Sequence, residues 1–178
     1  MNLQELYDSK GHEYYPTDKG TDHSYLQIYS ELFHPFQDKK INLIEIGICH
    51  GGGMRLFSEW FSQANIIGYD ITDRYLTVPL GIRSRAIFKD LKTFVFNEFA
   101  FFPPHIIIDD ATHFIEDQLK MVKVCYPQLQ KGGLLIIEDI TNIDKDKSKF
   151  DLLNIPYKII DLRSNKNKSD DVLIIYEK

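Results

Sequence analysis

The residues best suited to chemistry in this sequence are acids that follow two strongly apolar runs. Asp110 comes directly after the run 105–109, and Glu138 and Asp139 end the run that begins at Leu134. In an open α/β sheet the carboxyl ends of neighbouring parallel strands lie at one edge, so these three side chains are expected to converge. Three carboxylates cannot all stay ionised at close range without a cation or raised pKa values. Their oxygens suit Mg²⁺, Mn²⁺ or Ca²⁺, and we predict Mg²⁺ on Asp110, Glu138 and Asp139.

His113 follows Asp110 in the same loop and is expected to face the same crevice. An imidazole titrates near neutrality, which suits the removal of a proton from a hydroxyl that a metal has acidified. We therefore predict that His113 is a general base. The structural alternative is that the acids cap the helices that follow and that His113 is only a solvated loop residue.

Glycines follow the first apolar run, which contains Glu45 and leads into a helix through Gly47 and Gly51. Glycine lets a backbone approach a ligand at a helix N-terminus. Cys49 replaces the second glycine of a G-x-G-x-x-G motif, which weakens the case for NAD. Asp70 ends the second run, where a carboxylate can accept hydrogen bonds from both hydroxyls of a ribose. The set predicts an adenosine-containing cofactor; the alternative is a tight turn with Asp70 as a helix cap.

The elements that must position these residues alternate along the chain. Seven β-rich runs cover 41–46, 65–70, 85–88, 105–109, 134–138, 157–161 and 172–176, and apolar residues at helical spacing cover 25–33, 54–64 and 115–129. This alternation predicts an α/β fold with a parallel sheet covered on both faces. The polar stretch 163–171 predicts an antiparallel hairpin at the C-terminus, and the charged run 144–149 is expected to be a solvated loop. A seven-stranded, mostly parallel sheet with such a hairpin is typical of the Rossmann-like methyltransferase fold.

Composition narrows the function classes. The 178 residues carry a net charge of −5, which disfavours a nucleic-acid partner. No apolar stretch is long enough to cross a bilayer, and the N-terminus lacks the features of a secretory signal. Two cysteines are too few for a disulfide framework, so a cytoplasmic location is expected. The length predicts one domain over 1–178, with residues 1–40 forming a loop and helix that cover the cofactor.

An ordered set of short motifs carries a resemblance to a known family. They are TDKGTDHSY at 17–25, LIEIG at 43–47, GYDI at 68–71, IIDDATH at 107–113, EDQ at 116–118, KGG at 131–133 and IEDI at 137–140. The chain resembles class I S-adenosylmethionine-dependent methyltransferases, and more closely the metal-dependent sugar O-methyltransferases that modify macrolide antibiotics, with cephalosporin-hydroxylase-like relatives. Ala111 and Thr112 stand where that family commonly has Gly-Ser.

The resemblance implies a role for each site residue. The cofactor-binding set is Thr17, Lys19, Tyr25, Glu45, Gly47, Gly51, Asp70, Asp90 and Asp109. Asp90 is implied to lie near the adenine and Asp109 near the methionine part of S-adenosylmethionine, with the loop 17–25 folded over it. The family also has a divalent metal at the positions of Asp110, Glu138 and Asp139 and a general base at that of His113.

These observations predict a Mg²⁺-dependent O-methyltransferase that uses S-adenosylmethionine. The acceptor is expected to be a small molecule (a sugar, nucleotide sugar or glycoside), with no nucleic acid and no membrane partner; Mg²⁺ or Mn²⁺ and a homo-oligomer are left open. Three alternatives remain: a methyltransferase of catechol-like phenols, a non-catalytic cofactor-binding module and an NAD-dependent oxidoreductase. The appended N-terminal domain of the family is expected to be missing here.

Overall fold

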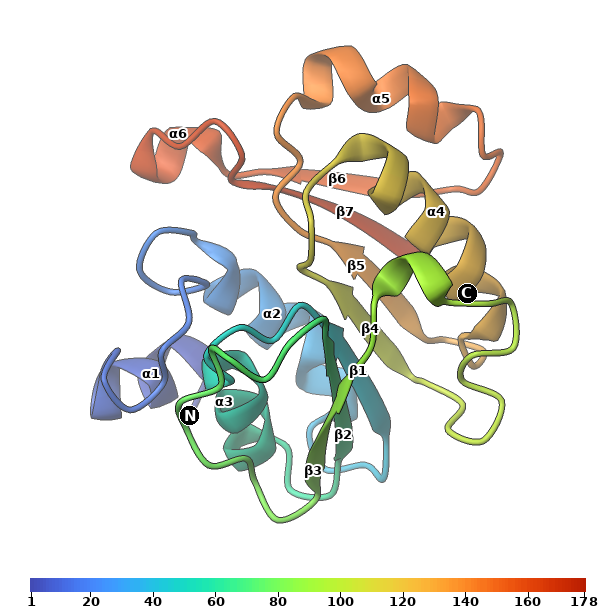
Figure 1. Ribbon diagram of the computed structural model, residues 1–178. Helices are drawn as coiled ribbons and strands as arrows, with labels where there is room; N and C mark the ends of the chain where they lie inside the picture. Colours follow the sequence, from blue (N-terminus) through green and yellow to red (C-terminus); the bar gives the residue numbers. More distant parts are fainter.

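A computed structural model describes residues 1–178 and contains one seven-stranded sheet in the order β3-β2-β1-β4-β5-β7-β6 (Figure 1). The strands are β1 Asn42–Ile46, β2 Asn65–Asp70, β3 Ser84–Phe88, β4 Ile106–Asp109, β5 Leu134–Ile137, β6 Lys158–Asp161 and β7 Val172–Glu177. Neighbours among the first five strands pair in parallel, whereas β7 is antiparallel to both β5 and β6. This arrangement confirms the predicted Rossmann-like methyltransferase fold with its C-terminal antiparallel hairpin.

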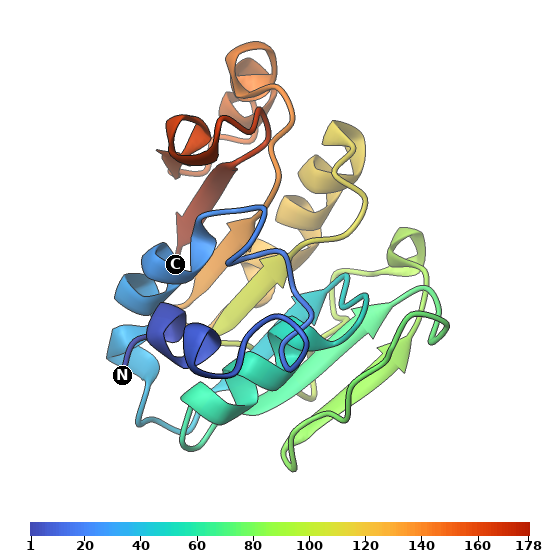
Figure 2. The same cartoon turned by 90° about the vertical axis from the view of Figure 1, so that its left-hand side faces the viewer.

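Helices cover both faces of the sheet (Figure 2). On one face lie α1 Leu3–Lys10, α2 Tyr25–Phe33 and α3 Gly52–Trp60, and on the other lie α4 Ile115–Cys125 and α5 Ile143–Asp151. A short helix, α6 Arg163–Lys166, stands between β6 and β7, and three 3₁₀ turns lie at His34–Phe36, Leu91–Thr93 and Tyr126–Gln128. No helix is long and apolar enough to cross a membrane.

Alternation of side chains along the central strands builds two hydrophobic cores. In β4, Ile106 and Ile108 face the core under α1, α2 and α3, while Ile107 faces the core under α4 and α5. All three are fully buried, and each stabilises the fold by roughly 1.5–3 kcal/mol relative to an exposed side chain. The two cores therefore fix the sheet, and with it the positions at which its strands end.

Two helices depart from the expectations drawn from the sequence. The unpredicted α1 begins with a capping box, in which Asn2 accepts from the backbone N–H of Glu5 and Glu5 accepts from that of Asn2. The run 144–149, expected to be a loop, lies within α5, which is capped by Asn142. Ile143 and Phe150 anchor its buried side, so a cap and two apolar anchors suffice to make a helix of a charged run.

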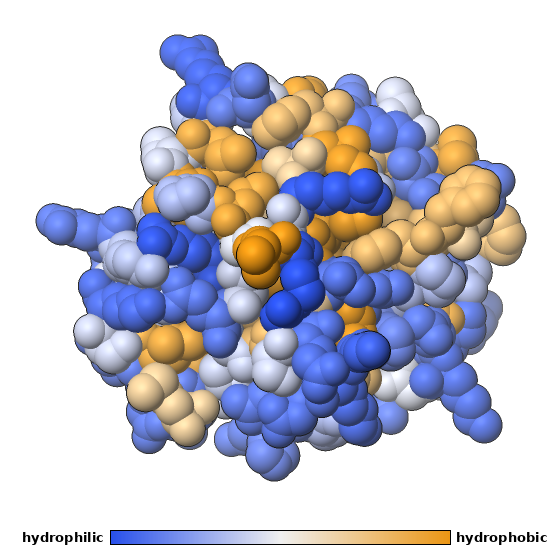
Figure 3. Space-filling model, turned by 90° about the horizontal axis from the view of Figure 1, so that it is seen from below, coloured by the Kyte–Doolittle hydropathy of each residue, from blue (hydrophilic) through white to orange (hydrophobic).

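The loop between α1 and α2 crosses the sheet edge where β1 and β4 end (Figures 1 and 2). Lys166 of α6 holds this loop in place because its Nζ donates to the backbone carbonyls of Gly20, Thr21 and His23, at 3.0, 2.7 and 2.6 Å. The lower surface of the molecule is mainly hydrophilic, with scattered apolar side chains (Figure 3). The loop segment 16–19 borders the cavity described next.

Candidate functional site

A cavity of about 540 Å³ lies at the carboxyl ends of β1, β2 and β4. Its walls come from the segments 46–50, 69–71, 89–92 and 110–113, and the loop segment 16–19 closes one side. This is the position at which open α/β sheets bind their ligands. The volume lies within the range that suits a small molecule or cofactor.

The turn after β1 is shaped by glycine and held by a carboxylate. Gly47 has a φ of +86°, and a Cβ there would overlap the backbone carbonyl of Asp110. Oδ2 of Asp70 accepts from the backbone N–H groups of Ile48 and Cys49, both at 3.0 Å. Asp70 therefore positions the turn that lines the cavity, in addition to the cofactor contact predicted for it.

Glu45 presents a buried carboxylate to the same cavity. Its side chain is 2% exposed, and Oε2 has no hydrogen-bond partner. Burial raises the pKa of Glu45 to about 7, against the opposing effect of Lys19. A Cβ on Gly53 would collide with Oε1 of Glu45, so a larger residue there would require this carboxylate to shift. The unpartnered Oε2 can accept a hydrogen bond from a ligand.

The remaining residues predicted to bind the cofactor separate into two groups. Thr17, Lys19 and Asp90 line the cavity, and Asp90 also caps the turn Leu91–Thr93 by accepting from the N–H of Lys92 at 2.8 Å. Three others, Gly51, Tyr25 and Asp109, do not line it. Gly51 instead supplies the left-handed N-cap of α3.

Two tyrosines of α2 donate to the acids that follow β5. The hydroxyl of Tyr25 donates to Oδ1 of Asp139 at 2.7 Å, and the hydroxyl of Tyr29 donates to Oε1 of Glu138 at 2.5 Å. Gln118 of α4 donates to the backbone carbonyl of Glu138 at 3.0 Å. Elements from both faces of the sheet therefore fix these two acids. Tyr25 contacts Asp139 and does not line the cavity.

Lys19 lies among three carboxylates. Its Nζ is 2.5 Å from Asp110, 2.9 Å from Glu138 and 3.6 Å from Glu45, and its side chain is 1% exposed. Burial by itself would lower the pKa of Lys19, but these carboxylates raise it well above its ordinary value. The chain itself therefore supplies part of the positive charge that the crowded carboxylates require. The residues at the strand ends gave no indication of this, because Lys19 lies in a distant loop.

Asp110, His113 and Asp139 form a compact group of metal-ligand type, with ligand atoms within 4.8 Å of one another. Nδ1 of His113 lies 3.6 Å from Oδ2 of Asp139 and has no hydrogen-bond partner. His113 and Asp139 both adopt left-handed backbone angles, with φ of 55° and 54°, a conformation that costs energy in non-glycine residues and is frequent at functional sites. Two carboxylates and an unpartnered imidazole nitrogen fit a divalent cation such as Mn²⁺ or Mg²⁺.

Glu138 stands apart from that group, although the sequence placed it among the metal ligands. It is 1% exposed, and its two oxygens are bound by Lys19 and Tyr29. Burial and the neighbouring Asp110 raise the pKa of Glu138 well above its ordinary value. Direct ligation by Glu138 would therefore require Lys19 to move.

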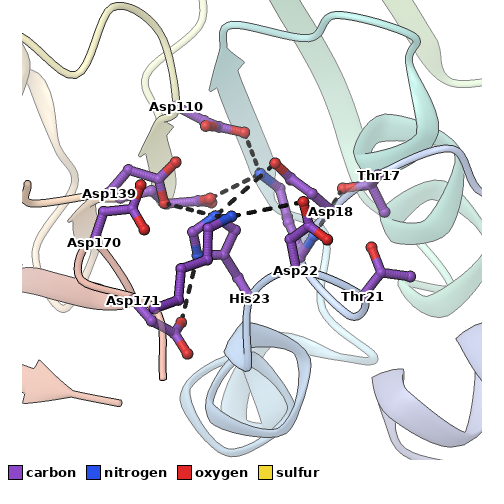
Figure 4. Close-up of polar contacts among 12 residues, drawn as sticks. Thr17, Asp18, Thr21, Asp22, His23, Asp110, Asp139, Asp170 and Asp171 are labelled. Atoms are coloured by element: carbon purple, nitrogen blue, oxygen red, sulfur yellow. Dashed lines mark hydrogen bonds and ion pairs between the residues drawn. The ribbon is translucent and has the colours of Figure 1, made fainter. Parts of the chain in front are cut away.

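Sequence reasoning assigned no role to His23, which lies buried beside the same acids. Its Nε2 is 3.5 Å from Oδ1 of Asp139 and 3.0 Å from Nζ of Lys168, and its ring stacks on Tyr25. Figure 4 shows it between the strand-end acids and the 17–22 segment. The sequence signals for His23 were its place in the motif at 17–25 and the crowding of ionisable residues in that loop.

Asp109 leads to a prediction about pH. It is 4% exposed and points towards the core under α4, and burial raises its pKa to about 8. An unfolded chain ionises this carboxyl near pH 4, so between pH 4 and 8 unfolding releases a proton. The stability of the protein should therefore fall as the pH rises through this window.

The substitution Asp109→Asn should flatten that dependence, raising the melting temperature at pH 8 relative to wild type more than at pH 5. Melting curves at both pH values measure it, with the exposed Asp73→Asn as the control. Parallel curves for wild type and Asp109→Asn would show that Asp109 is ionised in the fold.

Known proteins resemble this chain in sequence and in fold. No family model matches the chain. It is 29% identical to the 8-demethyl-8-alpha-L-rhamnosyl tetracenomycin-C 2'-O-methyltransferase of Streptomyces olivaceus over 70% of this chain and 35% of that protein. It is 26% identical to the demethylmacrocin O-methyltransferase of Streptomyces fradiae over 76% of this chain and 38% of that protein. The chain thus spans little more than a third of the length of these curated relatives.

Among solved structures, the MycE methyltransferase from the mycinamycin biosynthetic pathway, in complex with Mg and SAH, superimposes with a TM-score of 0.78. The sequence identity is 21%, and the match covers 100% of this chain and 55% of that one. These comparisons confirm the resemblance to sugar O-methyltransferases and the methyltransferase fold.

Proposed function

We propose that this protein transfers a methyl group from S-adenosylmethionine to a hydroxyl of a sugar or glycoside, with a divalent cation held at Asp110 and Asp139. The observation that carries the proposal is the group of Asp110, His113 and Asp139 beside a cavity of cofactor size. The similar proteins are named as O-methyltransferases of glycosylated compounds, and MycE was crystallised with Mg and SAH. The net charge of −5 favours a small acceptor over a nucleic acid.

The cavity offers S-adenosylmethionine the contacts that its parts require. Asp70 and Glu45 supply carboxylate oxygens for its hydroxyl and amino groups, and the turn at Gly47 allows close approach of the backbone. We propose that Asp90 lies on the adenine side and that Thr17 and Lys19 close the loop over the ligand. Glu45 is suited to the task because its Oε2 is buried without a partner.

The metal site supplies acidification of the acceptor hydroxyl and orientation of neighbouring oxygens when a divalent cation is bound. His113 accepts the hydroxyl proton. The acceptor oxygen then forms a bond to the methyl carbon as the bond from that carbon to sulfur breaks, which leaves S-adenosylhomocysteine. Asp110 and Asp139 supply the negative charge that would hold the cation. Tyr25 and Gln118 fix the orientation of Asp139, because they donate to its Oδ1 and to its backbone carbonyl.

Two measurements test the proposal. Calorimetry should show binding of S-adenosylmethionine and S-adenosylhomocysteine and no heat with NADH; heat with NADH alone would assign the fold to an oxidoreductase. Methyl transfer to a panel of sugars, glycosides and catechols, with Mg²⁺, Mn²⁺ or EDTA, should yield product from a sugar or glycoside only when a metal is present. Product from catechols alone would show that the acceptor is a catechol-like phenol and not a sugar. Binding without turnover on any acceptor would favour a non-catalytic module.

The substitution Asp70→Ala should weaken binding of S-adenosylhomocysteine by about 1–3 kcal/mol, the range for hydrogen bonds to charged groups. It removes the acceptor proposed for the ribose hydroxyls and frees the N–H groups of Ile48 and Cys49. Calorimetric titration measures the affinity, with Asp73→Asn on the following loop as the control. An unchanged affinity would mean that Asp70 serves the turn and not the ligand.

A further inference from the structure

Lys19 is the only cation in direct contact with the acids Glu45, Asp110 and Glu138. The lysine lies on the loop between α1 and α2, whereas its three partners come from β1 and from the segments after β4 and β5. Its side chain is almost completely buried, so the ammonium is shielded from solvent. The contact therefore joins the loop to the sheet at the centre of the candidate site.

The charge of this centre is incompletely balanced. The buried ammonium of Lys19 contacts three carboxylates, those of Glu45, Asp110 and Glu138. A fourth, that of Asp139, lies within 4.8 Å of Asp110. One ammonium cannot neutralise these carboxylates if all of them are ionised. A divalent cation would supply that charge at Asp110 and Asp139, close to Lys19 because Asp110 is common to both.

Lys19 and a metal ion would compete for the carboxylate of Asp110. Like charges that share one carboxylate repel, and they repel more in a buried site than in water. Glu138 can join the metal only if Lys19 gives up its contact at 2.9 Å. The lysine therefore lowers the affinity of the acids for metal and at the same time keeps the acids from repelling one another when no metal is bound.

We propose that Lys19 is a built-in counter-ion that tunes the affinity of the acidic cluster for divalent metal and stabilises the metal-free protein. This inference rests on the metal site of the proposed function. It assigns a loop residue outside the set of metal ligands the role of a positioning and charge-balancing residue. A lysine that merely fastened the loop would affect stability, but it would not oppose the metal.

The test is Mn²⁺ binding, followed by electron paramagnetic resonance and calorimetry without methyl donor or acceptor. Lys19→Met removes the charge and keeps the length of the side chain. It should bind Mn²⁺ about 10–100-fold more tightly than wild type, as expected when a neighbouring positive charge is removed. Lys147→Met, which removes a half-exposed lysine from α5, is the matched control and should bind Mn²⁺ like wild type.

Melting curves give the second readout. In EDTA, Lys19→Met should melt below wild type, and Mn²⁺ should raise its melting temperature about 3–5 °C more than it raises that of wild type, through ligand linkage. If Lys19→Met does not fold, the double variant Lys19→Met/Glu138→Gln restores the balance of buried charge and should still bind Mn²⁺ more tightly than wild type.

The outcomes separate this inference from the proposed function. Mn²⁺ bound by wild type and by the Lys19 variants with equal affinity would overturn the role of Lys19 and leave the metal site standing. Weaker binding by the variants would show that the lysine supports the metal, which also contradicts the inference. No Mn²⁺ binding by any of the proteins would overturn both the metal site and the inference.

Discussion

Replacing Asp110 by asparagine is expected to lower the rate of methyl transfer by at least about 10³-fold while binding of S-adenosylhomocysteine changes little. Asp110 is the carboxylate common to the ligand group with His113 and Asp139 and to the ion pair with Lys19. Its amide replacement removes the charge that attracts the cation. The backbone carbonyl of Asp110, which packs against Gly47 at the cavity wall, stays in place.

The experiment compares kcat, Mn²⁺ affinity and S-adenosylhomocysteine affinity for wild type, Asp110→Asn and the control Asp73→Asn. We expect Asp110→Asn to lose metal binding and turnover together and to keep its melting temperature within a few degrees, because Lys19 retains Glu138 and Glu45 as partners. Normal turnover by Asp110→Asn, or full activity of the wild type in EDTA, would show that the acids are structural and that the metal mechanism is wrong.

The sequence was sufficient for the sheet because each strand is a short apolar run bounded by polar residues. The run 134–138 became β5 with an error of one residue, and 65–70 became β2 without error. Parallel order was indicated by the helices that separate β1 from β2 and β4 from β5. The short helices α1 and α5 were missed because each buries only two residues, Leu3 and Tyr7 in α1 and Ile143 and Phe150 in α5, and each also depends on a cap.

The candidate site was predictable as far as it rests on strand ends. Asp70, Asp110 and His113 follow strands, and the structure brings them to one cavity. Alternation along β4 accounts for the directions of Asp109 and Asp110: Asp109 points to the same side as Ile107, into the core under α4, and Asp110 lines the site. The cofactor role predicted for Asp109 did not take this alternation into account. The contacts of Lys19 join residues 91 and 119 positions apart, and no local pattern encodes such contacts.

The loop between α1 and α2 illustrates a second limit. Strand-end reasoning inferred a missing cation from repulsion among carboxylates and assigned the whole deficit to a metal. The structure shows that the ammonium of Lys19 supplies part of this positive charge. Charge balance predicts that a cation is present, but it does not distinguish an ammonium from a metal ion.

Replacing His113 by glutamine is expected to slow methyl transfer by roughly 10²–10⁴-fold, the usual contribution of a general base. Two roles are open to this imidazole, because Nδ1 faces Asp139 at 3.6 Å and the ring also lines the cavity. As a base held by Asp139, His113 would take the acceptor proton and leave the metal to Asp110 and Asp139. As a ligand, it would contribute Nδ1 to the metal itself.

Mn²⁺ affinity separates these roles. We expect His113→Gln to bind Mn²⁺ and S-adenosylhomocysteine as wild type does, and we expect added imidazole to restore part of the activity of His113→Ala, since a small base can enter the space left by the ring. His34→Gln, at an exposed position beyond α2, is the matched control and should retain full activity. A fall in Mn²⁺ affinity of about 10-fold or more in His113→Gln, without rescue by imidazole, would make His113 a metal ligand, and the proton would then have to leave by another acceptor.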